Sequence, residues 1–106
     1  MRSGEITNIH GSWSDNSYAW VTDTWCLTGD CWLEVTLPQK GRLVIKKAET
    51  ENGPWPKVLI SPWSGPEFRI RLYGSTKYRY VKIYLTDNPD RIQFVNTKGY
   101  ACAPSD

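Results

Sequence analysis

Turn-forming residues interrupt this chain along its whole length. Gly, Pro, Asn, Asp and Ser recur about every 8–12 residues, and the segments between them alternate apolar and polar residues with a period of two. This pattern is typical of short β-strands, and no segment has the period of a helix. The expected strands are Ile6–Ile9, Tyr18–Cys26, Cys31–Leu37, Arg42–Ala48, Lys57–Ile60, Glu67–Tyr73, Tyr78–Leu85 and Arg91–Asn96. We therefore predict an all-β fold, a two-sheet antiparallel β-sandwich of jelly-roll-like type with about eight short strands.

The length of 106 residues predicts a single domain, residues 1–106, with one hydrophobic core. The net charge of +2 is too small to indicate nucleic-acid binding by electrostatics alone. No apolar run approaches the roughly 20 residues of a membrane span, and the first residues lack the apolar stretch of a signal peptide. We expect either a cytoplasmic protein or a domain of a larger secreted protein.

A tight hairpin is predicted around Thr28–Gly29. With these two residues as the turn, Cys26 faces Cys31 and Trp25 faces Trp32. A disulfide between the two cysteines fits this geometry, and it would favour an extracellular location because such bonds persist in oxidising compartments. The alternative is two buried thiols in a cytosolic core.

The same hairpin divides its residues between two faces. The first face looks like core and carries Trp20, Thr22, Thr24, Cys26, Cys31, Leu33, Val35 and Leu37. The second is mostly polar and carries Val21, Asp23, Trp25, Trp32, Glu34 and Thr36. Two indoles on a polar face would form a platform for a flat ligand. The alternative is that another segment covers this face and that both tryptophans belong to the core.

A second hairpin is predicted across residues 74–77, with Arg71 opposite Tyr80. Its core face carries Phe68, Ile70, Leu72, Val81, Ile83 and Leu85, and its outer face carries Arg69, Arg71, Tyr73, Tyr78, Tyr80, Lys82 and Tyr84. Guanidinium groups over phenol rings would make a flat surface for a sugar, an anionic polymer or a protein. An ordinary solvated sheet face explains the same residues.

Six Trp and six Tyr exceed what a core of this size needs. Two of the tryptophans, Trp55 and Trp63, lie in proline-rich loops. Because proline restricts the backbone, an indole held toward solvent there would lose little conformational entropy on binding. We expect at least one of them to be exposed. The alternative is that each folds back as a lid over one end of the sandwich.

Enzyme chemistry has little support in the sequence. The only histidine is His10, no Ser or Cys has a nearby His that would act as a base, and no phosphate loop or metal-binding spacing occurs. Cys102 has no obvious partner. We therefore predict a protein that is not an enzyme.

An aromatic-rich sandwich of this length resembles the carbohydrate-binding modules attached to polysaccharide-degrading enzymes. The resemblance implies a non-catalytic, extracellular, monomeric module that binds plant cell-wall β-glucan, cellulose-like or related, beside a glycoside hydrolase domain and with no nucleic acid or membrane as partner. The stacking and hydrogen-bonding residues would come from Trp55, Trp63, Trp25, Trp32, Tyr80 and Arg71. No cofactor is required, although a structural calcium is a feature of many such modules. Here its oxygen ligands would come from Asp15–Asn16, Asp23 or Asp87–Asp90.

Two other classes of function remain open. The first is a protein-interaction or structural domain of an adhesin, tail or virion that uses the Arg/Tyr face, because these residues are enriched in interface hot spots. The second is single-stranded nucleic-acid binding by aromatic stacking, which the small net charge argues against.

Overall fold

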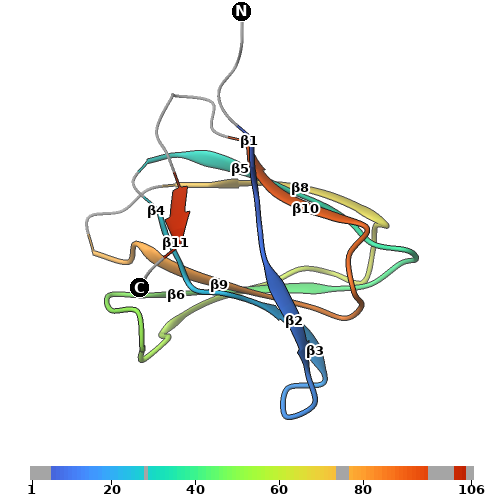
Figure 1. The fold of residues 1–106 in the computed structure, drawn as a ribbon, viewed down its shortest axis with the longest axis horizontal. Coiled ribbons are helices and arrows are strands. Elements are labelled where there is room, and N and C mark those ends of the chain that lie inside the picture. The colour runs from blue at the N-terminus through green and yellow to red at the C-terminus, as the bar shows by residue number, and fades with distance from the viewer. Residues whose placement is uncertain (1–5, 28, 74–76, 96–101, 105–106) are drawn as a thin grey trace, which may run out of the picture.

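The computed structural model of the chain describes residues 6–27, 29–73, 77–95 and 102–104. Two antiparallel sheets face each other across one core (Figure 1). The four-stranded sheet has the order β1 (Ile6–Asn8), β10 (Arg91–Val95), β5 (Cys31–Thr36) and β8 (Glu67–Leu72). This arrangement confirms the predicted all-β sandwich. The described residues include no helix that is long and apolar enough to cross a membrane.

The seven-stranded sheet is built around β9 (Tyr80–Leu85). One edge of β9 pairs with β3 (Ala19–Thr22) and then with β4 (Trp25–Leu27). The other edge pairs with β6 (Leu43–Ala48). The outer positions belong to β2 (Gly11–Ser14) beside β3, β11 (Cys102–Pro104) beside β4, and β7 (Lys57–Ile60) beside β6.

The positions of most strands agree with the sequence pattern, but neither predicted hairpin forms. The two strands that flank Gly29, β4 and β5, belong to different sheets, and so do β8 and β9. Each connection therefore crosses from one sheet to the other instead of turning back beside its own strand. The pairing of Arg71 with Tyr80 is wrong for this reason.

The predicted disulfide is also wrong. Cys31 is buried between the sheets, whereas Cys26 lies between buried Trp25 and Leu27 on β4 and so faces the opposite side of its strand. No bond joins the two cysteines. The hairpin that would have brought them together is replaced by a crossing between the sheets.

An extra residue between β3 and β4 moves Trp25 into the core. Val21 lies opposite Tyr84 and Trp25 lies opposite Val81. Between these two pairs, the chain from β3 to β4 therefore contains one more residue than β9 does. Such an insertion reverses the faces of the residues that follow it along the same edge of the ladder, which here are those of β4. The hydroxyl of Thr22 fills the gap in the ladder, because its Oγ1 accepts a 3.0 Å hydrogen bond from the Ile83 N–H.

The placement of Trp25 on a polar face is therefore wrong. Its ring is buried and meets Phe94 edge to face, with 5.4 Å between the ring centroids and 70° between the planes. Trp20 was predicted to be core, and it packs partly buried against the same cluster.

The remaining core agrees with the period-two pattern. On β5 the predicted inward residues Cys31, Leu33 and Val35 are buried, as is Leu37 just after the strand. The six predicted core residues of β8 and β9 also belong to the core, five of them buried and Ile70 packed against the cluster. The strands thus face the core as predicted, although their neighbours differ.

Candidate functional site

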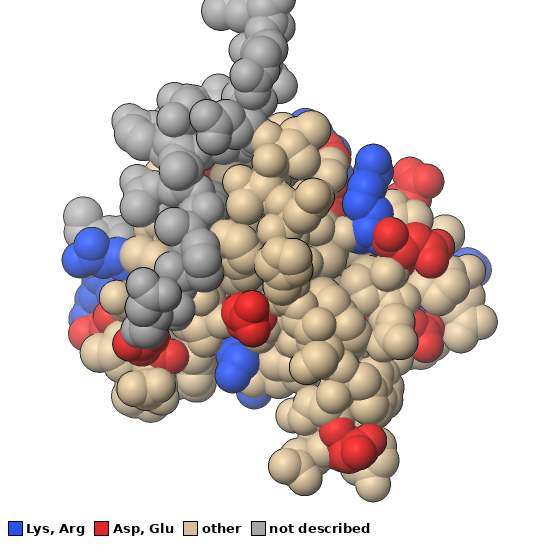
Figure 2. All heavy atoms as spheres, in the orientation of Figure 1, with Lys and Arg blue, Asp and Glu red and all other residues tan. Residues whose placement is uncertain are grey.

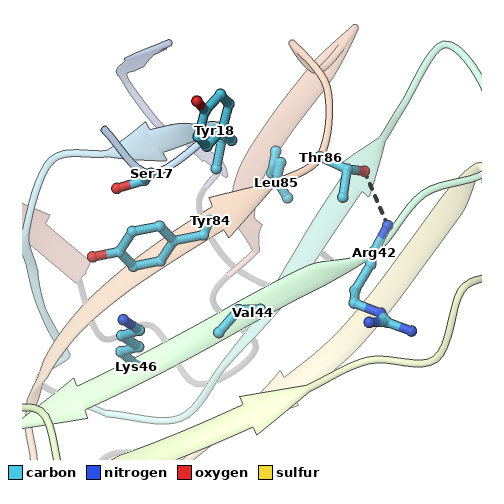
Figure 3. Close-up of a pocket in the computed structure, with 9 residues that line it drawn as sticks. Ser17, Tyr18, Arg42, Val44, Lys46, Tyr84, Leu85 and Thr86 are labelled. Carbon is cyan, nitrogen blue, oxygen red and sulfur yellow. Dashed lines mark hydrogen bonds between the residues drawn. The ribbon is translucent and has the colours of Figure 1, made fainter. Parts of the chain in front are cut away.

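A pocket of about 430 Å³ lies on the outer face of the seven-stranded sheet (Figure 3). Three segments form it. The β2–β3 turn supplies Ser17 and Tyr18, β6 supplies Val44 and Lys46, and the end of β9 supplies Tyr84. Arg42 and Thr86 close the opposite end. The volume lies within the range of roughly 300–1,000 Å³ that is usual for small-molecule sites.

The floor of the pocket depends on the pairing of β6 with β9. Val44 lies directly opposite Tyr84, so the two side chains adjoin on the outer face. The ammonium nitrogen of Lys46 lies 4.6 Å from the centroid of the Tyr84 ring. A tyrosine phenol is neutral at physiological pH, and partial burial raises the pKa of Tyr84 further above its ordinary value of 10.0. The floor is therefore a neutral aromatic surface beside one cation.

Tyr18 forms the rim of the pocket and is the most exposed of the large hydrophobic residues described, at 83 %. Its φ angle is 50°, in the left-handed region that a bulky residue rarely occupies. Such a backbone costs on the order of 1 kcal/mol, and strained residues of this kind cluster at functional sites as well as in turns. The Ser17 N–H donates a 3.3 Å hydrogen bond to the Ser14 hydroxyl within the same turn. The turn thus holds an aromatic ring out toward solvent beside Tyr84.

Arg42 and Thr86 fix the other end. The Arg42 N–H donates to Thr86 Oγ1 at 3.1 Å, and the Thr86 N–H donates to the Arg42 carbonyl at 3.2 Å. The guanidinium group of Arg42 extends away from Tyr84 in Figure 3, so Lys46 is the cation nearest the ring. Among the described lining residues none carries a carboxylate or an imidazole. The pocket offers stacking and hydrogen bonding.

The two loop tryptophans lie outside this pocket. Trp63 is exposed in the loop between β7 and β8, which confirms that at least one of the pair is exposed. Trp55 is half-buried, and a Cβ atom added at Gly53 would come within 2.8 Å of its Cδ1 and Nε1 atoms. The Trp55 indole therefore folds back onto its own loop.

Trp32 and Arg71 lie on the outer face of the four-stranded sheet. The guanidinium carbon of Arg69 is 3.9 Å from the centroid of a Trp32 ring, and that of Arg71 is 5.3 Å away. Arg71 also forms an ion pair of 3.6 Å with Asp30. Tyr80 belongs to the other sheet, so it shares no face with Arg71, and the predicted Arg/Tyr face is divided between two sides of the molecule.

None of the residues that line the pocket was among the predicted site residues, and its floor and rim are formed by Tyr18, Val44, Lys46 and Tyr84. The alternation along β9 did place Tyr84 on an outer face. The missing information was that β6 lies beside β9 and that the β2–β3 turn rises next to them.

Within the described ranges, no group of three or more His, Cys, Asp or Glu side chains could hold a metal ion. Asp87 instead lies 3.3 Å from the donating side-chain amide of Gln39.

Comparison of the chain with protein-family models, with curated proteins and with solved structures gave no significant match.

Proposed function

We propose that this domain is a non-catalytic carbohydrate-binding module that holds a β-linked glucan, cellulose-like or related, against Tyr84. The observation that carries the proposal is the open pocket, in which the neutral phenol ring of Tyr84 on the sheet lies beside the largely exposed ring of Tyr18 at the rim. In this proposal the module is extracellular, belongs to a larger secreted protein and anchors an attached glycoside hydrolase domain.

The chemistry of the lining matches a sugar. Pyranose rings have apolar C–H faces that stack on aromatic rings, while their hydroxyls need donors and acceptors at the edge. Tyr84 and Tyr18 supply the rings, and Lys46 and Ser17 supply polar groups at the edge. Lys46 lies over the Tyr84 ring, and its flexible stem lets the ammonium group turn aside and donate to a hydroxyl.

A second candidate is a protein-interaction domain that uses the outer face of the four-stranded sheet. The stacking of Arg69 and Arg71 on Trp32 favours it, since Trp and Arg are frequent hot-spot residues. Figure 2 views the two sheets edge-on, as Figure 1 does, and shows scattered acidic and basic side chains without one dominant sign of charge. This side of the molecule therefore gives no support to a polyanion as partner.

Affinity electrophoresis in gels that contain soluble β-glucans, with pull-down on cellulose, tests the proposal. Tyr84→Ala and Tyr18→Ala should each weaken binding roughly tenfold or more, the loss expected for an aromatic anchor. Tyr80→Ala is the matched control, because Tyr80 comes from the same strand and lies outside the pocket.

Trp63→Ala and Trp32→Ala test the other predicted aromatic residues in the same assay. The proposal is supported if glucan binds the parent and the Tyr80→Ala control equally well and binds the two pocket variants more weakly. If the parent binds no glucan, or if only Trp63→Ala or Trp32→Ala loses binding, the Tyr84 site is wrong.

A further inference from the structure

Strand β7 is an apolar edge that is exposed on both faces. Val58, Leu59 and Ile60 are 50 %, 51 % and 62 % exposed. Among the described strands β7 pairs with β6 and with no other, so its outer edge is open. Soluble proteins usually protect such an edge with charge, proline or a covering segment, because it is a template for pairing with another chain.

The pairing with β6 shows which backbone groups of β7 face the open edge. The Ser61 N–H donates to the Leu43 carbonyl at 2.9 Å, so the backbone of Ser61 points toward β6. The direction alternates along a strand. Leu59 therefore points toward β6 as well, while Val58 and Ile60 direct their N–H and C=O groups outward.

We propose that β7 pairs antiparallel with β7 of a second copy of this chain, about a two-fold axis at Leu59. Val58 of the first copy then lies opposite Ile60 of the second copy, and Ile60 of the first copy lies opposite Val58 of the second. Each of these pairs can exchange two hydrogen bonds, because both residues direct a donor and an acceptor outward. Lys57 lies opposite Ser61, so no like charges are directly opposed.

The flanking prolines select this register. A shift by one residue brings an outward residue against an inward one, so the ladder is lost. A shift by two residues places Val58 or Ile60 opposite Pro62 or Pro56, which have no N–H to donate. The same prolines stop the pairing from extending beyond the short strand, which favours a closed dimer over a fibre.

The groove beside β7 also suits a second copy rather than an acidic peptide. Its volume is about 260 Å³, and its cations already have partners within the chain. Lys47 Nζ donates to the Tyr73 carbonyl at 3.1 Å, Arg71 pairs with Asp30, and Lys57 lies 5.3 Å from the Tyr78 ring centroid. Leu59 is the apolar lining residue at the axis, so in the dimer it meets its own copy.

Dimerisation would join the two seven-stranded sheets into one. An axis perpendicular to the sheet keeps the outer faces of both copies on the same side, and Ile60 lies opposite the pocket residue Val44 in the β6–β7 pair. The two Tyr84 pockets would then face one polymer together and raise its avidity. The pairing itself does not depend on the proposed carbohydrate binding.

Sedimentation equilibrium of the chain over a range of concentrations tests the dimer. The parent should approach twice its mass of 12.2 kDa at high concentration. Ile60→Pro removes an outward N–H that β6 does not use, and Leu59→Lys places two ammonium groups together at the axis. Both variants should be monomeric. Ile6→Lys is the matched control for Leu59→Lys, because Ile6 is also an exposed apolar residue, at 62 %, on strand β1 of the other sheet.

Hydrogen exchange at the Val58 and Ile60 amides gives a readout on the parent alone. These amides should become protected as concentration rises, while the Leu59 amide stays protected throughout because it pairs with β6. A parent that is monomeric at every concentration would overturn the proposal. So would a dimer that persists in both β7 variants, or one whose Val58 and Ile60 amides stay unprotected.

Discussion

The ammonium group of Lys46 lies over the ring of Tyr84, and the partner of Lys46 across the β6–β9 ladder is a second lysine, Lys82. Like charges directly opposite each other in a sheet repel. The neutral ring thus gives Lys46 a contact that its cross-strand neighbour cannot provide. The same ring is the floor of the candidate site.

Lys82→Glu should stabilise the fold. The change converts an opposed pair of like charges into an opposed pair of unlike charges, which contributes about 0.2–1 kcal/mol to the free energy of unfolding. Urea denaturation at low ionic strength measures it. The gain should shrink as salt is added, since exposed charges are screened. A variant that is less stable than the parent at low salt would show that the two lysines do not repel in the folded state.

Thr22→Val should destabilise the domain by roughly 1–3 kcal/mol, because the change leaves the buried Ile83 N–H without an acceptor. Thr22→Ser keeps the hydroxyl and should lose much less. Thermal or urea denaturation of both variants measures the difference. Equal losses in Val and Ser variants would mean that the hydroxyl does not fill the gap in the β9 ladder.

Trp25→Ala should lower the free energy of unfolding by about 3–5 kcal/mol, since it empties a buried site beside Phe94. Trp63→Ala removes an exposed indole and should change stability by no more than about 0.5 kcal/mol. Denaturant titration of the two variants compares them directly. A small effect at Trp25 would contradict its place in the core.

Glu34 should make stability fall in acid. The hydrogen bond from the Gln93 side chain is the main cause that lowers the pKa of Glu34 below its ordinary value of 4.5, and the 3.1 Å bond from Arg69 lowers it further. A lowered pKa means that the stabilisation is present above about pH 4.5 and is lost as the pH falls through the folded-state pKa. Glu34→Gln should therefore cost about 1 kcal/mol at neutral pH.

The cost of Glu34→Gln should shrink as the pH falls through the folded-state pKa of Glu34, because the parent carboxyl then becomes protonated as well. Urea denaturation of the parent and the variant at neutral pH and over a series of acidic pH values measures this convergence. A difference that is independent of pH would show that the charge of Glu34 contributes nothing.

The fold class could be predicted from the sequence, because the alternation of apolar and polar residues with a period of two indicates which side chains face the core. Leu33 and Val35 on β5, and Ile83 and Leu85 on β9, are buried as predicted. The alternation does not indicate which strands are neighbours in a sheet. A turn within one sheet and a crossing between two sheets bury the same residues, so both predicted hairpins were wrong.

The site could not be predicted for two physical reasons. The extra residue before Trp25 reverses the faces of the β4 residues that follow it, and a single hydroxyl, that of Thr22, compensates for it in the ladder. The floor of the pocket joins Val44 to Tyr84 across strands that are far apart in the chain. Local pattern carries no information about either contact.

The central claim is that glucan binds on Tyr84. Nuclear magnetic resonance of the labelled chain, titrated with cello-oligosaccharides and mixed-linkage gluco-oligosaccharides, tests it most directly. The ring signals of Tyr84 and Tyr18, the methyl groups of Val44 and the side chain of Lys46 should shift in a saturable way, while those of Trp32 stay unchanged. No shift with any oligosaccharide, or shifts confined to Trp32 and its arginine neighbours, would contradict the account.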